Sequence, residues 1–381
     1  MIRKGKMKMK KILGAAVLAL LLLFGTAAGA LAEKTVLMTI AGDCTLGGEG
    51  FNRGKEDSFF AFAEKYGYDY FFANFRDLFD HDDLTVVNLE GVLSDSSNLE
   101  KKTKTFRFRG DTDYVKILTG SSVEAVSLAN NHSSDFGEQG ERNTKKTLDE
   151  SGVAWFRNDK YWVYEHDGIK IAFFGLENSK YYMLQKFLIK KFKELKESGE
   201  ANAIIVYLHT GSEYRGEHND KQFKMATNLI NLGADLILMS HVHVLQGVDV
   251  IKNRMVFYSL GNYVFGGNSA IRYEKYGGNK DCTSLYSMAI QVKMSFSNSG
   301  EYLGQRVVIY PAFISDDPNV NHYQPIRLGV QDAQPVWDAI QRDTAFELPA
   351  LKEDANGLAM IEFPYVAASE SAMTPEETDG E

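Results

Sequence analysis

Short apolar runs that pass directly into a chemically active residue recur along the first two thirds of the chain. The clearest run covers residues 236–239, behind Gly233, and continues into a Ser-His-Val-His stretch that contains His241 and His243. A run of this length is typical of a strand buried on both faces. Two histidines two residues apart on extended backbone lie on the same side, and neutral imidazole is the commonest protein metal ligand. The stretch therefore predicts either a metal site at a strand end or two surface histidines in a loop.

Four other predicted strands end in the same way. Asp43 follows residues 36–40, Glu90 follows 84–87, Asn131 and His132 follow 123–128, and His209 follows 203–208. In open α/β sheets, binding sites form outside the carboxyl ends of the strands. Five strand ends in Asp, Glu, Asn or His favour one shared metal site over five unrelated loop caps.

The remaining pattern predicts an α/β fold, with helices between the strands. Helical periodicity covers residues 59–79 (one or two helices), 138–151, 180–199 and 222–232. A hairpin is predicted over 162–165 and 169–174, and later strands over 255–259, 287–294 and 306–310, the last two antiparallel. Strands that alternate with helices are the pattern of an α/β sheet with helical layers.

Residues 93–108 are polar and basic at their centre, with Lys101, Lys102 and Lys104, and predict an exposed loop that enters a short strand over 106–108. Arg107 and Arg109 at its end either face an anionic substrate or are solvated charges on an edge strand. The pattern favours the second interpretation, because edge strands commonly carry such charges.

The candidate ligands form a mixed nitrogen and oxygen set. Two carboxylates can bridge cations, an amide supplies an oxygen, and three imidazoles supply nitrogens: Asp43, Glu90, Asn131, His209, His241 and His243. This set suits Mn²⁺, Zn²⁺, Fe or Mg²⁺. It exceeds what one tetrahedral ion needs, and two ions ~3.5–4 Å apart would use it and clamp a displacement at phosphorus. We expect one or two divalent ions.

His132 and Asp135 are the candidate catalytic pair. His132 adjoins Asn131 and is placed to donate a proton to a leaving oxygen, and Asp135 to orient its ring. The alternatives are a further ligand or a structural hydrogen bond for His132, and a helix N-cap for Asp135.

Charge and cysteine content exclude several classes of protein. The net charge is −9, and without residues 1–32 the chain has 36 basic and 51 acidic residues, a net charge of −15. A body this acidic is unsuited to sequence-independent nucleic-acid binding, so we expect no nucleic-acid partner. Cys44 and Cys282 are too few for a disulfide framework or a thiolate metal site, and could pair once or stay free.

The N-terminal segment predicts export. Residues 1–11 carry six basic side chains, residues 12–32 are uncharged, and Ala30-Leu31-Ala32 forms a small-x-small cleavage site before Glu33. Residues 1–32 are therefore a signal peptide or, alternatively, an uncleaved membrane anchor. At the other end, residues 331–366 form a C-terminal extension, and the acidic, apolar-poor residues 367–381 a disordered tail.

The order of these motifs resembles the CapA family of bacterial capsule or poly-γ-glutamate synthesis proteins, which are related to calcineurin-like metallophosphoesterases. The resemblance covers residues 36–265. Its motifs are Gly42-Asp43, Asn88-Leu89-Glu90, Ala129-Asn130-Asn131-His132 with Asp135 and Gly137, His209-Thr210-Gly211-Ser212-Glu213-Tyr214, His241-Val242-His243 with Gln246-Gly247, and Tyr258-Ser259-Leu260-Gly261-Asn262.

The resemblance implies a four-layer α/β/β/α sandwich of the metallophosphoesterase type over residues 33–330, with the six ligands named above. It also implies that Glu213, Tyr214 and Asn262 shape a substrate pocket. Two departures stand out. Metallophosphoesterases open with Asp-x-His, whereas Cys44 and Thr45 follow Asp43 here, and Glu90 stands where those enzymes have Asp.

Two functions of different class follow from the resemblance. The first is an exported, extracellular or cell-surface metal-dependent hydrolase or transferase that acts on an anionic cell-surface polymer or its precursor. The second is a non-catalytic component of a membrane complex for polymer synthesis and export, which uses the same fold as a binding platform.

Overall fold

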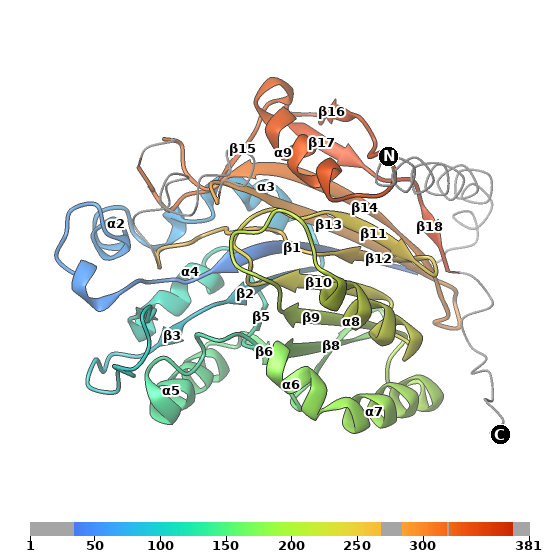
Figure 1. Cartoon of the computed structure of the whole chain (residues 1–381), viewed down its shortest axis with the longest axis horizontal. Helices are drawn as coiled ribbons and strands as arrows, with labels where there is room; N and C mark the ends of the chain where they lie inside the picture. Colours follow the sequence, from blue (N-terminus) through green and yellow to red (C-terminus); the bar gives the residue numbers. More distant parts are fainter. Residues whose placement is uncertain (1–33, 268–283, 318–319, 369–381) are drawn as a thin grey trace, which may run out of the picture.

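The computed structural model describes residues 34–267, 284–317 and 320–368 (Figure 1). The predicted signal peptide or anchor over residues 1–32, Cys282, and residues 369–381 of the predicted tail lie outside these ranges. No helix within the described residues has the length and apolar character needed to cross a membrane.

Among the described residues, the larger sheet contains ten strands and is built around β1 (Lys34–Cys44). Its main order is β16 (Leu351–Glu353), β17 (Ala359–Glu362), β14 (Tyr302–Phe313), β13 (Tyr286–Phe296), β1, β2 (Leu84–Leu89), β5 (Ala125–Ser127) and β6 (Ala154–Phe156), while β15 (Ile326–Arg327) and β18 (Val366–Ala367) also pair with β14. β1, β2, β5 and β6 run parallel, whereas β13 and β14 form an antiparallel hairpin.

The second sheet contains six strands in the part of the chain that the structure describes. Their order is β11 (Val248–Ile251), β12 (Arg254–Phe257), β10 (Leu236–Ser240), β9 (Ala203–His209), β8 (Ile169–Glu177) and β7 (Trp162–His166). The four central strands are parallel. A short separate pair is formed by β3 (Val92–Leu93) and β4 (Arg109–Gly110).

The two sheets pack face to face because their strands are apolar on both sides. In β2, Leu84 and Val86 face the core between the sheets, while Val87 and Leu89 face the helices outside. The outer face of the large sheet is covered by α2 (Phe59–Tyr66), α3 (Arg76–Phe79), α4 (Val115–Thr119) and α5 (Gly137–Glu150). That of the small sheet is covered by α6 (Asn178–Met183), α7 (Gln185–Ser198) and α8 (Asp220–Asn231) (Figure 1).

The predicted α/β class is confirmed. The four-layer order of the sandwich stays a prediction. One helix does not lie in an outer layer: α9 (Val330–Arg342) places Ala333, Val336 and Ile340 in the core that the two sheets share. Figure 1 shows α9 beside β17, away from α6–α8. The C-terminal segment thus shares the main core.

Several predicted elements differ locally from the observed ones. The five predicted strands, the hairpin and the antiparallel β13–β14 pair are confirmed. The helix predicted over 180–199 is two helices, interrupted at Leu184. The strand predicted over 106–108 is wrong, since pairing begins only at Arg109 in β4. Arg109 is also buried, which contradicts a solvated edge charge, and Arg107 pairs with Glu100 at 2.7 Å.

The parallel strands place the polar residues that follow them at one edge of the two sheets. Asp43 lies beside Asn88 in the register of β1 and β2, and Ser240 lies beside His209 in that of β9 and β10. A single parallel bridge between Asp43 and Asn262 joins the ends of the two sheets. The carboxyl ends of both sheets therefore meet, which is where α/β folds form their sites.

Candidate metal centre

Five side chains from both sheets converge at this edge. Glu90, His209 and His241 form one group, and Asp43, Glu90 and His243 form a second. Within each group the possible ligand atoms all lie within 4.8 Å of one another. Because Glu90 belongs to both groups, the geometry fits either one ion or two ions that share this carboxylate.

Glu90 is the central residue of the site. It is fully buried, and within the described part of the chain neither of its carboxylate oxygens has a hydrogen-bond partner. Its Oε1 lies 3.4 Å from His209 Nε2 and 3.9 Å from His243 Nε2. Burial, and then the charge of Asp43, raise the pKa of Glu90 to about 8. A buried carboxylate without donors is costly unless a cation compensates it, so this residue fits a divalent ion.

His209 and His241 are held in the form that binds metals. Burial lowers the pKa of His209 to about 3 and lowers the pKa of His241 well below its usual value. Both rings are therefore neutral at neutral pH, as metal ligation requires. The Nδ1 atom of His209 lies 2.9 Å from Ser240 Oγ, which leaves Nε2 directed at Glu90.

Asp43 and His243 are each oriented by an asparagine. Asn88 Nδ2 donates to Asp43 Oδ1 at 2.7 Å. His243 Nδ1 lies 2.9 Å from Asn262 Oδ1 and 3.6 Å from Asp43 Oδ2. Such outer contacts fix the ring orientation of a metal-ligating histidine.

His132 and Asp135 form the pair that the sequence predicts. His132 Nδ1 lies 2.7 Å from Asp135 Oδ2, and His132 Nε2 lies 3.9 Å from Glu90 Oε1. The ring stacks on Phe108, whose backbone N–H donates to the same Asp135 oxygen at 2.9 Å. Asp135 does not cap α5, because the N-cap position is Phe136.

The other predicted site residues differ in their exposure. Asn131 is exposed, and its Oδ1 lies 2.7 Å from His209 Nε2, within reach of the first group. Tyr214 lies beside the site, with its ring centroid 5.9 Å from that of His243, whereas Glu213 is exposed. Asn262 is buried and contacts the candidate ligand His243, and its place in a substrate pocket stays a prediction.

The sequence pattern did not identify two residues that lie at the site, Asn88 and Lys104. Asn88 lies inside the Asn-Leu-Glu motif, so its position two residues before Glu90 on a strand could have identified it. Lys104 had no local signal. Its Nζ bonds to Asp135, 31 residues away, and to the main-chain oxygen of Asn131.

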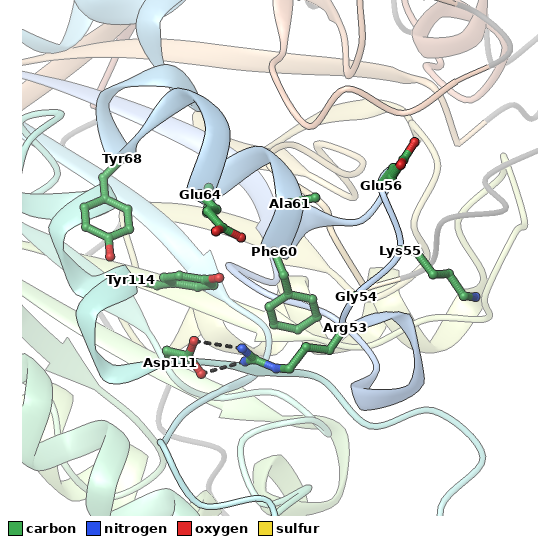
Figure 2. A pocket seen from close by; sticks show the side chains of 11 residues that line it. Arg53, Gly54, Lys55, Glu56, Phe60, Ala61, Glu64, Tyr68, Asp111 and Tyr114 are labelled. Atoms are coloured by element: carbon green, nitrogen blue, oxygen red, sulfur yellow. Dashed lines mark hydrogen bonds and ion pairs between the residues drawn. The ribbon is translucent and has the colours of Figure 1, made fainter.

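A separate groove of about 560 Å³ beside α2 carries none of these residues (Figure 2). Its Arg53 is paired with Asp111 at 2.6 Å, and the guanidinium lies 4.1 Å from the centre of the Phe60 ring. Because the Arg53 guanidinium of this groove is already neutralised by Asp111, we place the candidate functional site at the strand ends and not in the groove.

Replacing Asn262 with alanine is expected to weaken metal binding roughly 10–100-fold, the usual cost of removing an outer partner of a ligand. The reason is that His243 loses the group that fixes its ring. Titration with Mn²⁺ by calorimetry measures the change. Unaltered affinity in a folded variant would mean that His243 is not a ligand.

Replacing Glu90 with glutamine is expected to stabilise the metal-free protein at alkaline pH. Because the pKa of Glu90 is raised from 4.5 to about 8, the folded state keeps a proton that the unfolded state loses between these values. Stability therefore falls as pH rises through this window, and glutamine removes that loss. We expect the variant to gain about 1–4 kcal/mol of unfolding free energy at pH 8 relative to pH 5. Urea unfolding in EDTA measures it, and an identical pH slope for both proteins would contradict the expectation.

Comparison with known proteins places the chain within a family. Residues 37–267 match the family model described as bacterial capsule synthesis protein PGA_cap. The capsule biosynthesis protein CapA of Bacillus anthracis is 29% identical over 257 residues, which cover 61% of this chain and 60% of that protein. The PGA biosynthesis protein CapA of Bacillus subtilis (strain 168) is 29% identical over 224 residues, covering 53% of this chain and 58% of that protein. The matches thus span less than two thirds of these relatives.

Two solved structures from Thermus thermophilus are more distantly similar. A hypothetical protein shares 14% identity at a TM-score of 0.41, covering 72% of this chain and 99% of that chain. TT1561 shares 11% identity at a TM-score of 0.34, covering 60% of this chain and 90% of that chain.

Proposed function

The chain belongs to the PGA_cap family of bacterial capsule synthesis proteins, and we propose that it serves polymer synthesis as a metal-dependent hydrolase or transferase. The bond cleaved or transferred is a phosphoryl, amide or ester bond of a cell-surface polymer or its precursor. One observation carries the proposal: the buried Glu90 carboxylate lacks hydrogen-bond donors among the described residues and lies between neutral imidazoles.

Each residue of the site has a distinct task in this proposal. Asp43, Glu90, Asn131, His209, His241 and His243 would hold one or two divalent ions. When bound, such ions supply Lewis-acid charge next to the reacting bond. Ser240, Asn88 and Asn262 orient three of the ligands, so that little reorganisation is needed during the reaction.

His132 is the proton donor. Asp135 accepts the Nδ1–H of His132, which fixes the tautomer and leaves Nε2 directed toward Glu90. A second proton, carried at Nε2 in the imidazolium form, can pass to the oxygen or nitrogen that leaves, and the ring then returns to neutral imidazole with its Nδ1–H still on Asp135. The Phe108 ring covers one face of the imidazole and limits access of water to it.

A second candidate function is a non-catalytic platform in a polymer synthesis complex. The observation that favours it is the lack of an Asp-x-His histidine. Cys44 is buried with a pKa raised far above its usual value, and Thr45 Oγ1 accepts the backbone N–H of Gly266 at 2.7 Å. Neither side chain takes the place of that ligand.

A turnover assay separates the two candidates. The Mn²⁺-loaded protein is offered a generic phosphodiester and then γ-linked glutamate oligomers. Turnover of either substrate that stops on removal of the metal supports the enzyme. If the metal-loaded protein turns over neither substrate, the platform is the better account.

A further inference from the structure

We propose that Lys104 is the anion-binding residue of the metal centre, and that it donates one N–H to an oxyanion of the substrate. This inference rests on the proposed function, because it assigns a partner to the same site. Lys104 lies in the segment over 93–108, which the sequence alone predicts to be an exposed loop.

The Lys104 ammonium is built into the site. Its Nζ bonds to the fully buried carboxylate of Asp135 and to the main-chain oxygen of Asn131. The second contact places the ammonium next to a candidate ligand, since the side chain of the same Asn131 reaches His209.

The backbone around Lys104 is fixed by several bonds to the turn that carries His132. Lys101 N–H donates to the main-chain oxygen of Asp135 at 2.8 Å, and Phe108 N–H donates to the Asp135 carboxylate at 2.9 Å. Arg107, itself paired with Glu100, donates to the main-chain oxygen of Lys104 at 2.7 Å. The ammonium is thus pre-organised rather than carried by a free chain.

The hydrogen-bond capacity of Lys104 leaves room for a ligand. An ammonium has three donors. Asp135 and Asn131 account for two of them among the described residues, and the side chain keeps 29% of its surface exposed. A phosphate or carboxylate oxygen that also faces the ions can accept the third. A hydrogen bond between two charged groups is stronger than one between neutral groups, which makes this contact a determinant of affinity.

The test measures binding of oxyanions to the Mn²⁺-loaded protein by calorimetry, without any requirement for turnover. The probes are inorganic phosphate and the dipeptide γ-glutamylglutamate. Lys104→Met is expected to weaken binding of at least one probe roughly 10- to 100-fold while Mn²⁺ affinity stays within about 3-fold. Lys104→Arg, which keeps the charge, restores most of the affinity. Lys102→Ala is the matched control, because Lys102 is an exposed lysine of the same loop, and it leaves binding unchanged.

The outcomes separate this inference from the proposed function. Weakened phosphate binding identifies a phosphoryl substrate, and weakened γ-glutamylglutamate binding identifies a carboxylate polymer. If Lys104→Met binds both probes as wild type does, or wild type binds neither, the inference is wrong and Lys104 only neutralises Asp135. If Lys104→Met does not fold, Lys104→Gln, which keeps a neutral donor to Asp135, is measured in its place. If probe binding depends on Lys104 but the metal-loaded protein turns over no substrate, the proposed hydrolase activity is wrong and the role of Lys104 in anion binding still holds.

Discussion

His132→Ala is expected to lower turnover roughly 10²–10⁴-fold, the usual contribution of a positioned general acid. Its Nε2 is 3.9 Å from Glu90, close enough to serve a group bound at the centre, and its Nδ1 is occupied by Asp135. We therefore expect the ring to donate a proton rather than to ligate. Metal content, measured by mass spectrometry of the element after dialysis, should be unchanged.

A matched control for this variant is His81→Ala. His81 is exposed and contacts the main-chain oxygen of Asp77, outside the site. It should alter neither turnover nor metal content. If His132→Ala loses the metal while His81→Ala keeps it, His132 is a ligand and its assignment as proton donor is wrong.

His241→Ala is expected to abolish metal binding in the group formed with Glu90 and His209, and turnover with it. Removing a ligand should reduce affinity by more than the roughly 10–100-fold lost with an outer partner. The His241 ring is neutral and lies 4.7 Å from that of His209, centroid to centroid, so its loss leaves this group with one imidazole. Calorimetric titration with Mn²⁺ measures the loss.

The contrast between the two histidine variants is the informative result. His132→Ala should retain the metal and lose turnover, whereas His241→Ala should lose both. A His241→Ala protein that is folded and binds Mn²⁺ as wild type does would remove His241 from the ligand set.

The strand ends could be predicted from the sequence because each is marked by neighbouring residues along the chain. An apolar run followed by Asp43, Glu90, His209 or His241 marks both the strand and its carboxyl end, and parallel strands bring these ends together. The α/β class followed from the same alternation.

Contacts between distant segments could not be predicted in this way. Lys104 was expected in solvent because its acceptor Asp135 lies on a different segment. The contact between Asn262 and His243 depends on how the segments after β12 and β10 meet, which the sequence pattern does not give. Residues 106–108 have a strand-like composition, but Phe108 packs on His132 and does not pair as a strand. In each case tertiary contacts decided what local propensity could not.

An anomalous-scattering map of crystals grown with Mn²⁺ tests the metal centre most directly. We expect a peak within about 2.0–2.6 Å of Glu90 and of the nitrogens of His209 and His241, with any second peak beside Asp43 and His243. A map without a peak at Glu90, or with its strongest peak away from these five side chains, would contradict it.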